Sequence, residues 1–486
     1  MNKTKFFTVM MLGAALFMLL LAPAALTAQE KMPVTTVSPE AEEQFIEGKN
    51  QFLLMHFPEA IDHLTQAVEL DPSFAQAHLY LAIAKTGWTG LDTKHLNKAV
   101  TLANEVAKGE KQLIHYAKAM NDGDENKISL YRNNLIEMYP EDEMVRIWAA
   151  MYHYASQEYD KVIKHMQKAV DINDNFHAGY NLLGYGYMET GEMQKAEKAF
   201  HKYLELVPEN ANAHDSYAEY LLRNGQFDES IEHYNKALEI NPKFTASHKG
   251  LADNYLFKGN TAMARQHYQK LTKNNSSVTD KFSGMLYEAS VDLHEDNHGS
   301  ALATIDKYIM MAEEKDIPYY QIYGNAYKGH ILTETGKANE GMKYYQKAID
   351  LVAKTDLDPV MKRNMETQAQ LWEFYALASN KEMEEAEKVM KKCENTLNEQ
   401  GNNQQWKTYH QVRGIMELHR GLYNQARQHL AKAHNTPETW YYTGLTWEKE
   451  GQRDEARKWY QKVTVHYQNT IELGTVRNKA MAGLEK

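Results

Sequence analysis

The 486-residue sequence repeats one pattern every 34 positions, and this period constrains the fold more than any other feature. From residue 41 to residue 278 the units keep this register without a shift. In such an array each unit is buried against its neighbours, so a long chain needs no single large core. The clearest unit, residues 177–210, contains Tyr180, Leu183, Gly184, Tyr187, Gly191, Ala196, Phe200 and Pro208.

The residue types at the repeated positions predict a pair of antiparallel helices in each unit. Small residues such as Gly184, Ala196 and Ala218 allow two helices to approach closely, and aromatic residues fill the gaps between them. Glycine permits the turn between the helices, and proline ends the second helix. The residues at these turns and ends are Gly191, Gly225, Gly259, Pro208 and Pro242.

The spacing aromatic-x2-Leu-Gly-x2-Tyr, followed by Ala-x3-Phe and a later proline, resembles the signature of the tetratricopeptide-repeat (TPR) superfamily. The resemblance covers nearly the whole chain after its N-terminal segment. It implies an all-α fold, a right-handed superhelical solenoid of antiparallel helix pairs. Residues 217–255 look like those of exported bacterial TPR proteins of unassigned function. That likeness implies a scaffold or adaptor, and it names no ligand.

We expect five segments along the chain. After residue 278 the signature continues with irregular spacers, and the last stretch is expected to form a helix that shields the open end of the stack. The segments are a signal peptide (1–28), a linker (29–40), a regular TPR array (41–278), irregular TPR-like units (279–467) and a C-terminal capping helix (468–486).

The N-terminus has the three parts of a secretory signal peptide. Lys3 and Lys5 supply positive charge, residues 9–22 are apolar without a break, and small residues follow Pro23. This pattern predicts a periplasmic or secreted protein that is cleaved near Ala28. The alternative is an uncleaved anchor, because residues 6–26 are nearly long enough to span a bilayer. Contact with a membrane is expected only in that case.

The composition excludes several classes of function. The net charge is −11 and no basic stripe is present, so nucleic acid is not an expected partner. The single cysteine, Cys393, excludes an internal disulfide framework and a cysteine-based metal site. The sequence has no phosphate-binding glycine-rich loop, nucleophile elbow or EF-hand loop. We therefore expect no cofactor and no enzymatic activity.

One catalytic pattern does occur, the H-E-x-x-H motif that begins at His294 and ends at His298. In zinc proteases both histidines of this motif lie on one face of a continuous helix. The repeat register instead predicts that His294 and Glu295 end one helix, that a turn follows, and that His298 occupies an aromatic position of the next helix. A zinc hydrolase is thus a remote alternative.

The inner face of the first helices is the usual ligand surface of TPR proteins. The acidic residues at two of its positions argue against the carboxylate-gripping mode of some TPR adaptors, which requires basic or amide groups there. They favour a protein or peptide partner with basic and apolar side chains. The expected binding residues are Asn181, Tyr185, Asp215, Glu219, Lys249 and Asp253.

The 31 tyrosines and 7 tryptophans leave a second function open. Carbohydrate-binding proteins use aromatic platforms, so the chain could be a glycan-binding accessory protein of the cell envelope. Most of the tyrosines occupy packing positions of the repeat, which favours the protein-binding interpretation. Exposure of Tyr185 and Tyr441 would distinguish the two functions.

Overall fold

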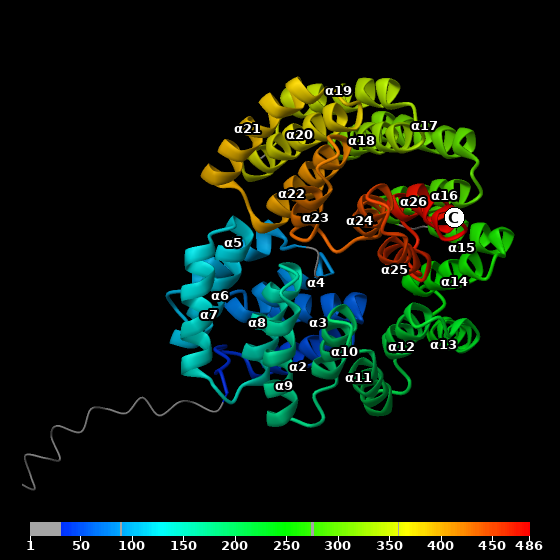
Figure 1. Ribbon diagram of the computed structural model, residues 1–486. Coiled ribbons are helices and arrows are strands. Elements are labelled where there is room, and N and C mark those ends of the chain that lie inside the picture. Colours follow the sequence, from blue (N-terminus) through cyan, green and yellow to red (C-terminus); the bar gives the residue numbers. More distant parts are fainter. Residues whose placement is uncertain (1–30, 88–89, 274–276, 358) are drawn as a thin grey trace, which may run out of the picture. The chain divides into compact units, whose positions relative to one another are not determined.

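The computed structural model describes residues 31–87, 90–273, 277–357 and 359–486. The predicted signal peptide lies outside these residues. The described residues form 25 helices and no strand, which confirms the all-α solenoid of antiparallel helix pairs (Figure 1). Among the described helices, none combines the length and the apolar character that crossing a bilayer requires. The chain divides into two compact units, residues 1–186 (unit 1) and 187–486 (unit 2), with the boundary inside helix α10.

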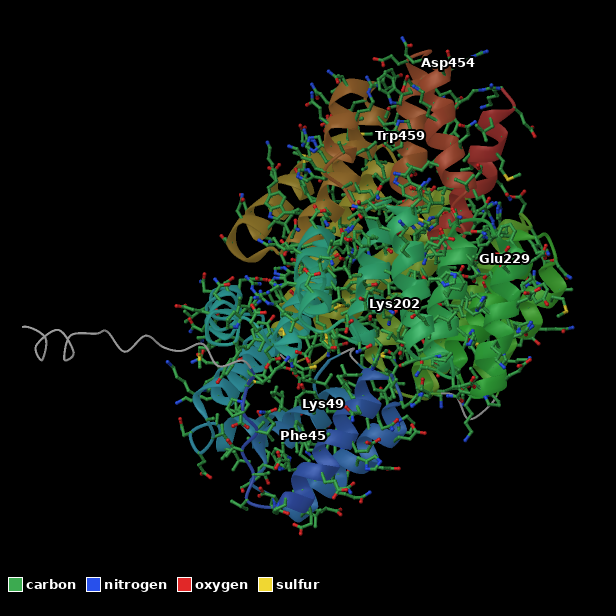
Figure 2. The ribbon with its side chains drawn as sticks, turned by 90° about the horizontal axis from the view of Figure 1, so that it is seen from below. Phe45, Lys49, Lys202, Glu229, Asp454 and Trp459 are labelled. Carbon is green, nitrogen blue, oxygen red and sulfur yellow. The ribbon has the colours of Figure 1, made fainter. Side chains whose placement is uncertain are left out.

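In unit 1 each first helix packs against the second helix that follows it, and successive pairs then stack. Aromatic rings fill the space between neighbouring first helices: Phe45, labelled in Figure 2, lies 4.8 Å from Phe74 and 5.4 Å from Tyr80, measured between ring centroids. The helices are α2 (Pro39–Leu53), α3 (Phe57–Leu70), α4 (Ala75–Ala84), α5 (Thr93–Leu102), α6 (Lys108–Asp122), α7 (Glu125–Met138), α8 (Glu143–Ala155), α9 (Tyr159–Ile172) and α10 (His177–Glu189).

Unit 2 continues the same alternation of first and second helices. Exposed acidic residues such as Glu229 and Asp454 lie in the first turn of second helices (Figure 2). Their negative charge interacts favourably with the positive end of the helix dipole. The helices are α11 (Met193–Leu206), α12 (Ala211–Arg223), α13 (Phe227–Ile240), α14 (Thr245–Phe257), α15 (Thr261–Lys273), α16 (Val278–His294), α17 (His298–Glu314), α18 (Pro318–Glu334), α19 (Ala338–Lys354), α20 (Pro359–Ser379), α21 (Met383–Gln400), α22 (Asn403–His419), α23 (Tyr423–Leu430), α24 (Pro437–Lys449), α25 (Arg453–Thr464) and α26 (Ile471–Leu484).

The turn inside each pair requires a residue in the left-handed backbone conformation. Gly225 and Gly259 have φ angles of 77° and 83°. One period earlier than Gly191, the same position is held by Gln157, whose φ is 57°. The turn geometry is therefore retained where the glycine of the repeat is missing.

The C-terminal helix has two sets of contacts. It packs against α24 and α25, the helix pair that precedes it. It also lies along α16 and α18, and in Figure 1 the red α26 is seen beside the green α16. The repeat period gave no indication of this second contact.

The expected linker is partly an extended segment bound to unit 1. Residues 31–37 are not helical, and backbone N–H groups of this segment donate to carboxylates at or near the starts of α4, α6 and α8. The segment is therefore attached along the N-terminal ends of three first helices. The three bonds run from Met32 to Asp142 (2.7 Å), from Thr35 to Glu110 (3.0 Å) and from Val37 to Asp71 (3.2 Å).

Several helix pairs have a glycine where their two helices cross. A Cβ atom built on Gly48 would lie 2.7 Å from Leu64, one on Gly414 would lie 2.6 Å from Leu430, and one on Gly444 would lie 2.7 Å from Tyr460. In all three pairs the large side chain stands 16 residues after the glycine. A larger residue at this position would force the helices apart.

We predict that Gly444→Leu lowers the free energy of unfolding by about 1–3 kcal/mol, because the added side chain overpacks the contact with Tyr460. Thermal and urea unfolding followed by circular dichroism would measure the change. Gly299→Leu is the control, since a Cβ at Gly299 meets no atom within 4 Å. Equal stability of the two variants would contradict this packing account.

Candidate functional site

Four of the six expected binding residues lie together on α12 and α14 of unit 2. Asp215 and Glu219 are one turn apart on α12, and Lys249 and Asp253 are one turn apart on α14. Asp215 is 7% exposed, and its Oδ1 accepts a hydrogen bond of 2.7 Å from the Ser247 hydroxyl of α14. Burial raises the pKa of Asp215 to about 7, although this hydrogen bond favours the ionised form.

The other charges of this set are paired within the protein. Arg223 lies 2.7 Å from Glu219 and 2.6 Å from Glu189. Lys249 lies 2.8 Å from Asp253, and the carboxylate raises the pKa of Lys249 although partial burial acts to lower it. The inner face of α12 and α14 is therefore much closer to neutral than its acidic residues alone indicate.

The stretch that precedes α26 covers these residues. Gln468 Nε2 donates to Glu219 at 3.3 Å, and Asn469 Nδ2 donates to the hydroxyl of Tyr268 at 2.9 Å. The same hydroxyl donates to Asp253. On α16, the Ser290 hydroxyl donates to Asn469 Oδ1 at 2.6 Å. A polypeptide segment of the chain itself thus occupies part of the expected ligand surface of unit 2.

Aromatic contacts fix the segment further. The ring of Tyr467 lies 5.0 Å from Phe227 and 5.4 Å from Phe257, and the guanidinium of Arg477 lies 4.8 Å from the Phe257 ring. Sequence reasoning missed the binding role of residues 467–477, because no local signal relates them to helices about 200 residues earlier. The role of the α12 and α14 residues in binding a partner stays a prediction.

The remaining two expected residues, Asn181 and Tyr185, lie on the part of α10 that belongs to unit 1. The Tyr185 ring is half-buried and lies edge-on to Tyr154 of α8 at 6.4 Å. Tyr441 is also half-buried, packed between Tyr442 and Tyr460. Neither ring forms the exposed platform that the glycan-binding alternative requires.

The H-E-x-x-H segment has the geometry that the repeat register predicts. Helix α16 ends at His294, and α17 begins at His298. Asp296 in the turn has a φ of 54°, so no continuous helix brings the two histidines to one face. Glu295, the general base of the protease motif, is bound to Arg265. Among the described residues, no group of three or more metal-ligating side chains comes together.

Unit 1 has an apolar groove on its first helices. The groove encloses a cavity of about 330 Å3 at the C-terminal ends of α4, α6 and α8. The cavity is lined mainly by Ile83, Leu91, Met120, Trp148 and Met151. Sequence reasoning did not single out these residues. A signal was available, because Met151 stands one period before Tyr185, at the same position of the repeat.

Stacked helix pairs with a small residue at several of their crossings define an α-helical repeat protein. Residues 181–243 and 319–353 match models of the tetratricopeptide repeat, so the chain contains repeats of the TPR type. In general terms this fold makes it a protein-interaction scaffold, since stacked repeats of this kind provide extended binding surfaces.

Several known proteins are similar to parts of the chain. The small glutamine-rich tetratricopeptide repeat-containing protein 2 of Saccharomyces cerevisiae is 29% identical over 110 residues, which are 22% of this chain and 32% of the yeast protein. The solved structure of MamA is 20% identical, covers 32% of this chain and 91% of its own, and has a TM-score of 0.29. The solved structure of YrrB, described as a TPR protein with an unusual peptide-binding site, is 18% identical. The match covers 36% of this chain and 89% of the YrrB chain, with a TM-score of 0.27.

We predict that Asp215→Asn gains stability relative to wild type as the pH rises. The unfolded chain releases the Asp215 proton near pH 4, whereas the folded protein holds it to about pH 7, so the wild type loses stability between these values. Asparagine does not titrate and can still accept the Ser247 hydrogen bond. The difference in free energy of unfolding between variant and wild type should increase by roughly 1–3 kcal/mol from pH 5 to pH 8.

Urea unfolding at the two pH values would measure this difference. Asp228→Asn, at an exposed carboxylate of α13, is the control for general effects of pH. A stability difference for Asp215→Asn that stays constant between pH 5 and pH 8 would show that Asp215 is ionised in the folded protein throughout this range.

Proposed function

We propose that the chain is an exported scaffold that binds a segment of a partner protein in the apolar groove on the first helices of unit 1. The observation that carries the proposal is the cavity of about 330 Å3 along Met120, Trp148 and Met151, which is large enough for one or two apolar side chains. Met120 and Met151 are partly exposed, and flexible methionine side chains adapt to different apolar partners.

The bound segments of the chain support this choice of ligand. In unit 1, carboxylates near the starts of α4, α6 and α8 hold residues 31–37 through backbone N–H groups. In unit 2, first helices hold the stretch before α26 through side-chain hydrogen bonds. First helices of this chain thus bind polypeptide in two places, and the groove at the opposite ends of α4, α6 and α8 remains for a partner. Asn181 and Tyr185 would extend this surface along α10.

Export is part of the proposal and rests on the N-terminal pattern of charged, apolar and small residues. Cleavage after Ala28 would leave a chain that starts at Gln29 and keeps all the contacts of residues 31–37. We expect N-terminal sequencing of the protein recovered from cells to begin near Gln29. An intact N-terminus in the membrane fraction would show an uncleaved anchor instead.

The groove is tested by site-specific photocrosslinking in cells that produce the protein. A photoreactive amino acid in place of Met151 should capture a discrete partner, because this side chain lines the groove. The same amino acid in place of Leu130, which is 54% exposed on the second helix α7, is the matched control and should capture none. Equal capture at both positions, or capture at Leu130 alone, would exclude the groove as the site.

Once the partner is captured, Met151→Glu should weaken its binding to the purified protein by at least about tenfold, or 1.4 kcal/mol. The reason is that a carboxylate in the groove must lose its hydration when an apolar side chain enters. Calorimetric titration of wild type and variant would measure the change, with circular dichroism as the check on folding. Unchanged affinity would contradict the proposal.

A further inference from the structure

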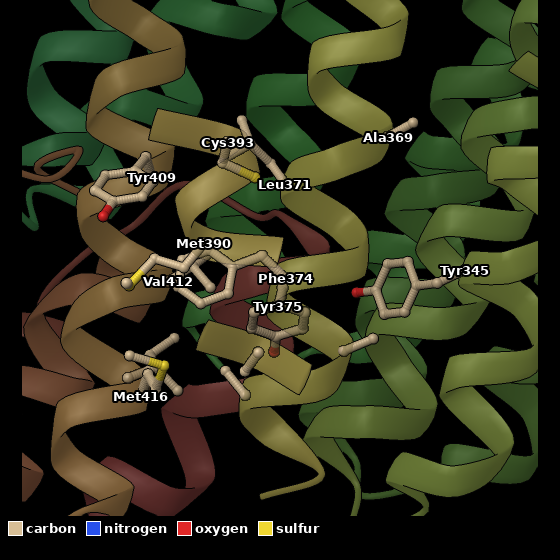
Figure 3. Packing of buried hydrophobic residues seen from close by; sticks show 14 of the residues in the cluster. Tyr345, Ala369, Leu371, Phe374, Tyr375, Met390, Cys393, Tyr409, Val412 and Met416 are labelled. Carbon is tan, nitrogen blue, oxygen red and sulfur yellow. The ribbon is translucent and has the colours of Figure 1, made fainter. Parts of the chain in front are cut away.

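A second cavity, of about 250 Å3, lies within unit 2 and has aromatic walls. The aromatic side chains come from three helices: Tyr323 and Tyr327 from α18, Tyr345 from α19, and Trp372 and Tyr375 from α20. Tyr323 and Trp372 are half-buried at the rim, whereas Tyr345 and Tyr375 are buried. Figure 3 shows Tyr345 pointing from its helix toward Tyr375. Aromatic side chains thus form much of the cavity wall.

Carboxylates of helices α24 and α26 complete the cavity. Glu438, which is 5% exposed, and the half-buried Glu472 line it. A third carboxylate close by, Glu334, is satisfied: it lies 2.7 Å from Lys479 and accepts hydrogen bonds from the hydroxyls of Tyr375 and Tyr442. Among the described residues, no lysine or arginine forms an ion pair with Glu438 or Glu472.

Two buried polar atoms of the cavity residues lack a hydrogen-bond partner among the described residues. Glu438 Oε2 accepts a hydrogen bond of 2.7 Å from Gln411, but Glu438 Oε1 accepts none. His330 Nε2 is also without a partner. Such atoms are costly to bury, and a ligand with N–H groups would satisfy both if the proton of His330 is on Nδ1. Burial raises the pKa of Glu438 to about 7; His330 and the hydrogen bond from Gln411 act to lower this pKa, whereas Glu334 and Glu472 raise it further.

We propose that this cavity binds the ammonium or guanidinium end of an organic cation. Its N–H groups donate to Glu438 Oε1 and His330 Nε2, and its positive charge lies against the rings of Tyr323, Tyr327 and Trp372, whose faces attract cations. The cavity is smaller than those that enclose drug-sized ligands, so it fits a lysine or arginine side chain or a short alkylamine. The inference goes beyond the proposed function, because the cavity lies in unit 2 and the groove in unit 1.

The charge requirement is tested with butylammonium chloride and, as a neutral probe of similar size, n-butanol. We expect calorimetric titration of the mature protein to give a dissociation constant of about 1 mM or lower for butylammonium. We expect n-butanol to bind at least about tenfold more weakly, since it cannot pair with Glu438. Equal binding of the two probes would overturn the proposal.

Variants locate the binding in the cavity. Glu438→Gln keeps the shape of the side chain and should weaken butylammonium binding at least about tenfold. Trp372→Leu removes one ring and should weaken it roughly three- to tenfold. Glu340→Gln, at an exposed carboxylate of α19, is the matched control and should bind as wild type does. Wild-type affinity in both cavity variants, with folding verified by circular dichroism, would overturn the assignment.

The source of the cation is decided by comparing butylammonium with blocked lysine and blocked arginine, the Nα-acetyl methylamides. Tighter binding of a blocked amino acid supports a side chain of a partner protein, and tighter or equal binding of butylammonium supports a free amine. Both results support the cavity chemistry. The groove is tested by crosslinking at Met151 and the cavity by butylammonium binding, so a failure of the groove and a failure of the cavity are distinguishable.

Discussion

The close approach of the two helices in each pair is the contact on which the rest of the structure depends. At Gly48, Gly414 and Gly444 there is no room for a Cβ atom, because Leu64, Leu430 or Tyr460 of the second helix fills the space. Packing this tight fixes how far apart the helices stand, and so which side chains of the first helix point away from its partner. Those side chains form the inner face. The chemistry of the inner face therefore depends on the residues at positions that are not used for packing within the pair.

Some carboxylates of unit 2 are paired with a cation of the protein, and others are not. Lys249, which is partly exposed, forms an ion pair with the buried Asp253, and Glu219 is paired with Arg223. A partly buried pair of this kind adds little net stability but removes the cost of leaving the buried charge alone. Glu438 is buried in the same unit without such a cation. The contrast matters because the protein supplies a cation in the first two cases, whereas Glu438 Oε1 has no partner among the described residues.

The period predicted the helix pairs, the turns and the break inside the H-E-x-x-H segment, since all of these depend on residues within one repeat. The charge pairing of the expected binding residues on α12 and α14 could have been predicted, because Glu219 with Arg223 and Lys249 with Asp253 have i,i+4 spacing. The hydrogen bonds that Asn469 forms with Tyr268 and Ser290 could not be predicted. A periodic signal describes contacts between neighbours, whereas this contact joins residues that no periodic rule relates.

The contact between the C-terminal stretch and α16 also affects the order in which unit 2 can fold. Most contacts of a repeat array are local, so such arrays can nucleate anywhere and grow outward. The hydrogen bond from Ser290 to Asn469 spans 179 residues, and it forms only when the end of the chain is present. Until then, helices α14 to α18 lack the hydrogen bonds that Asn469 forms with Tyr268 and Ser290. A ribosome that has made residue 290 still has this stretch to synthesise, and a chain that stops short of it leaves the middle of the array open.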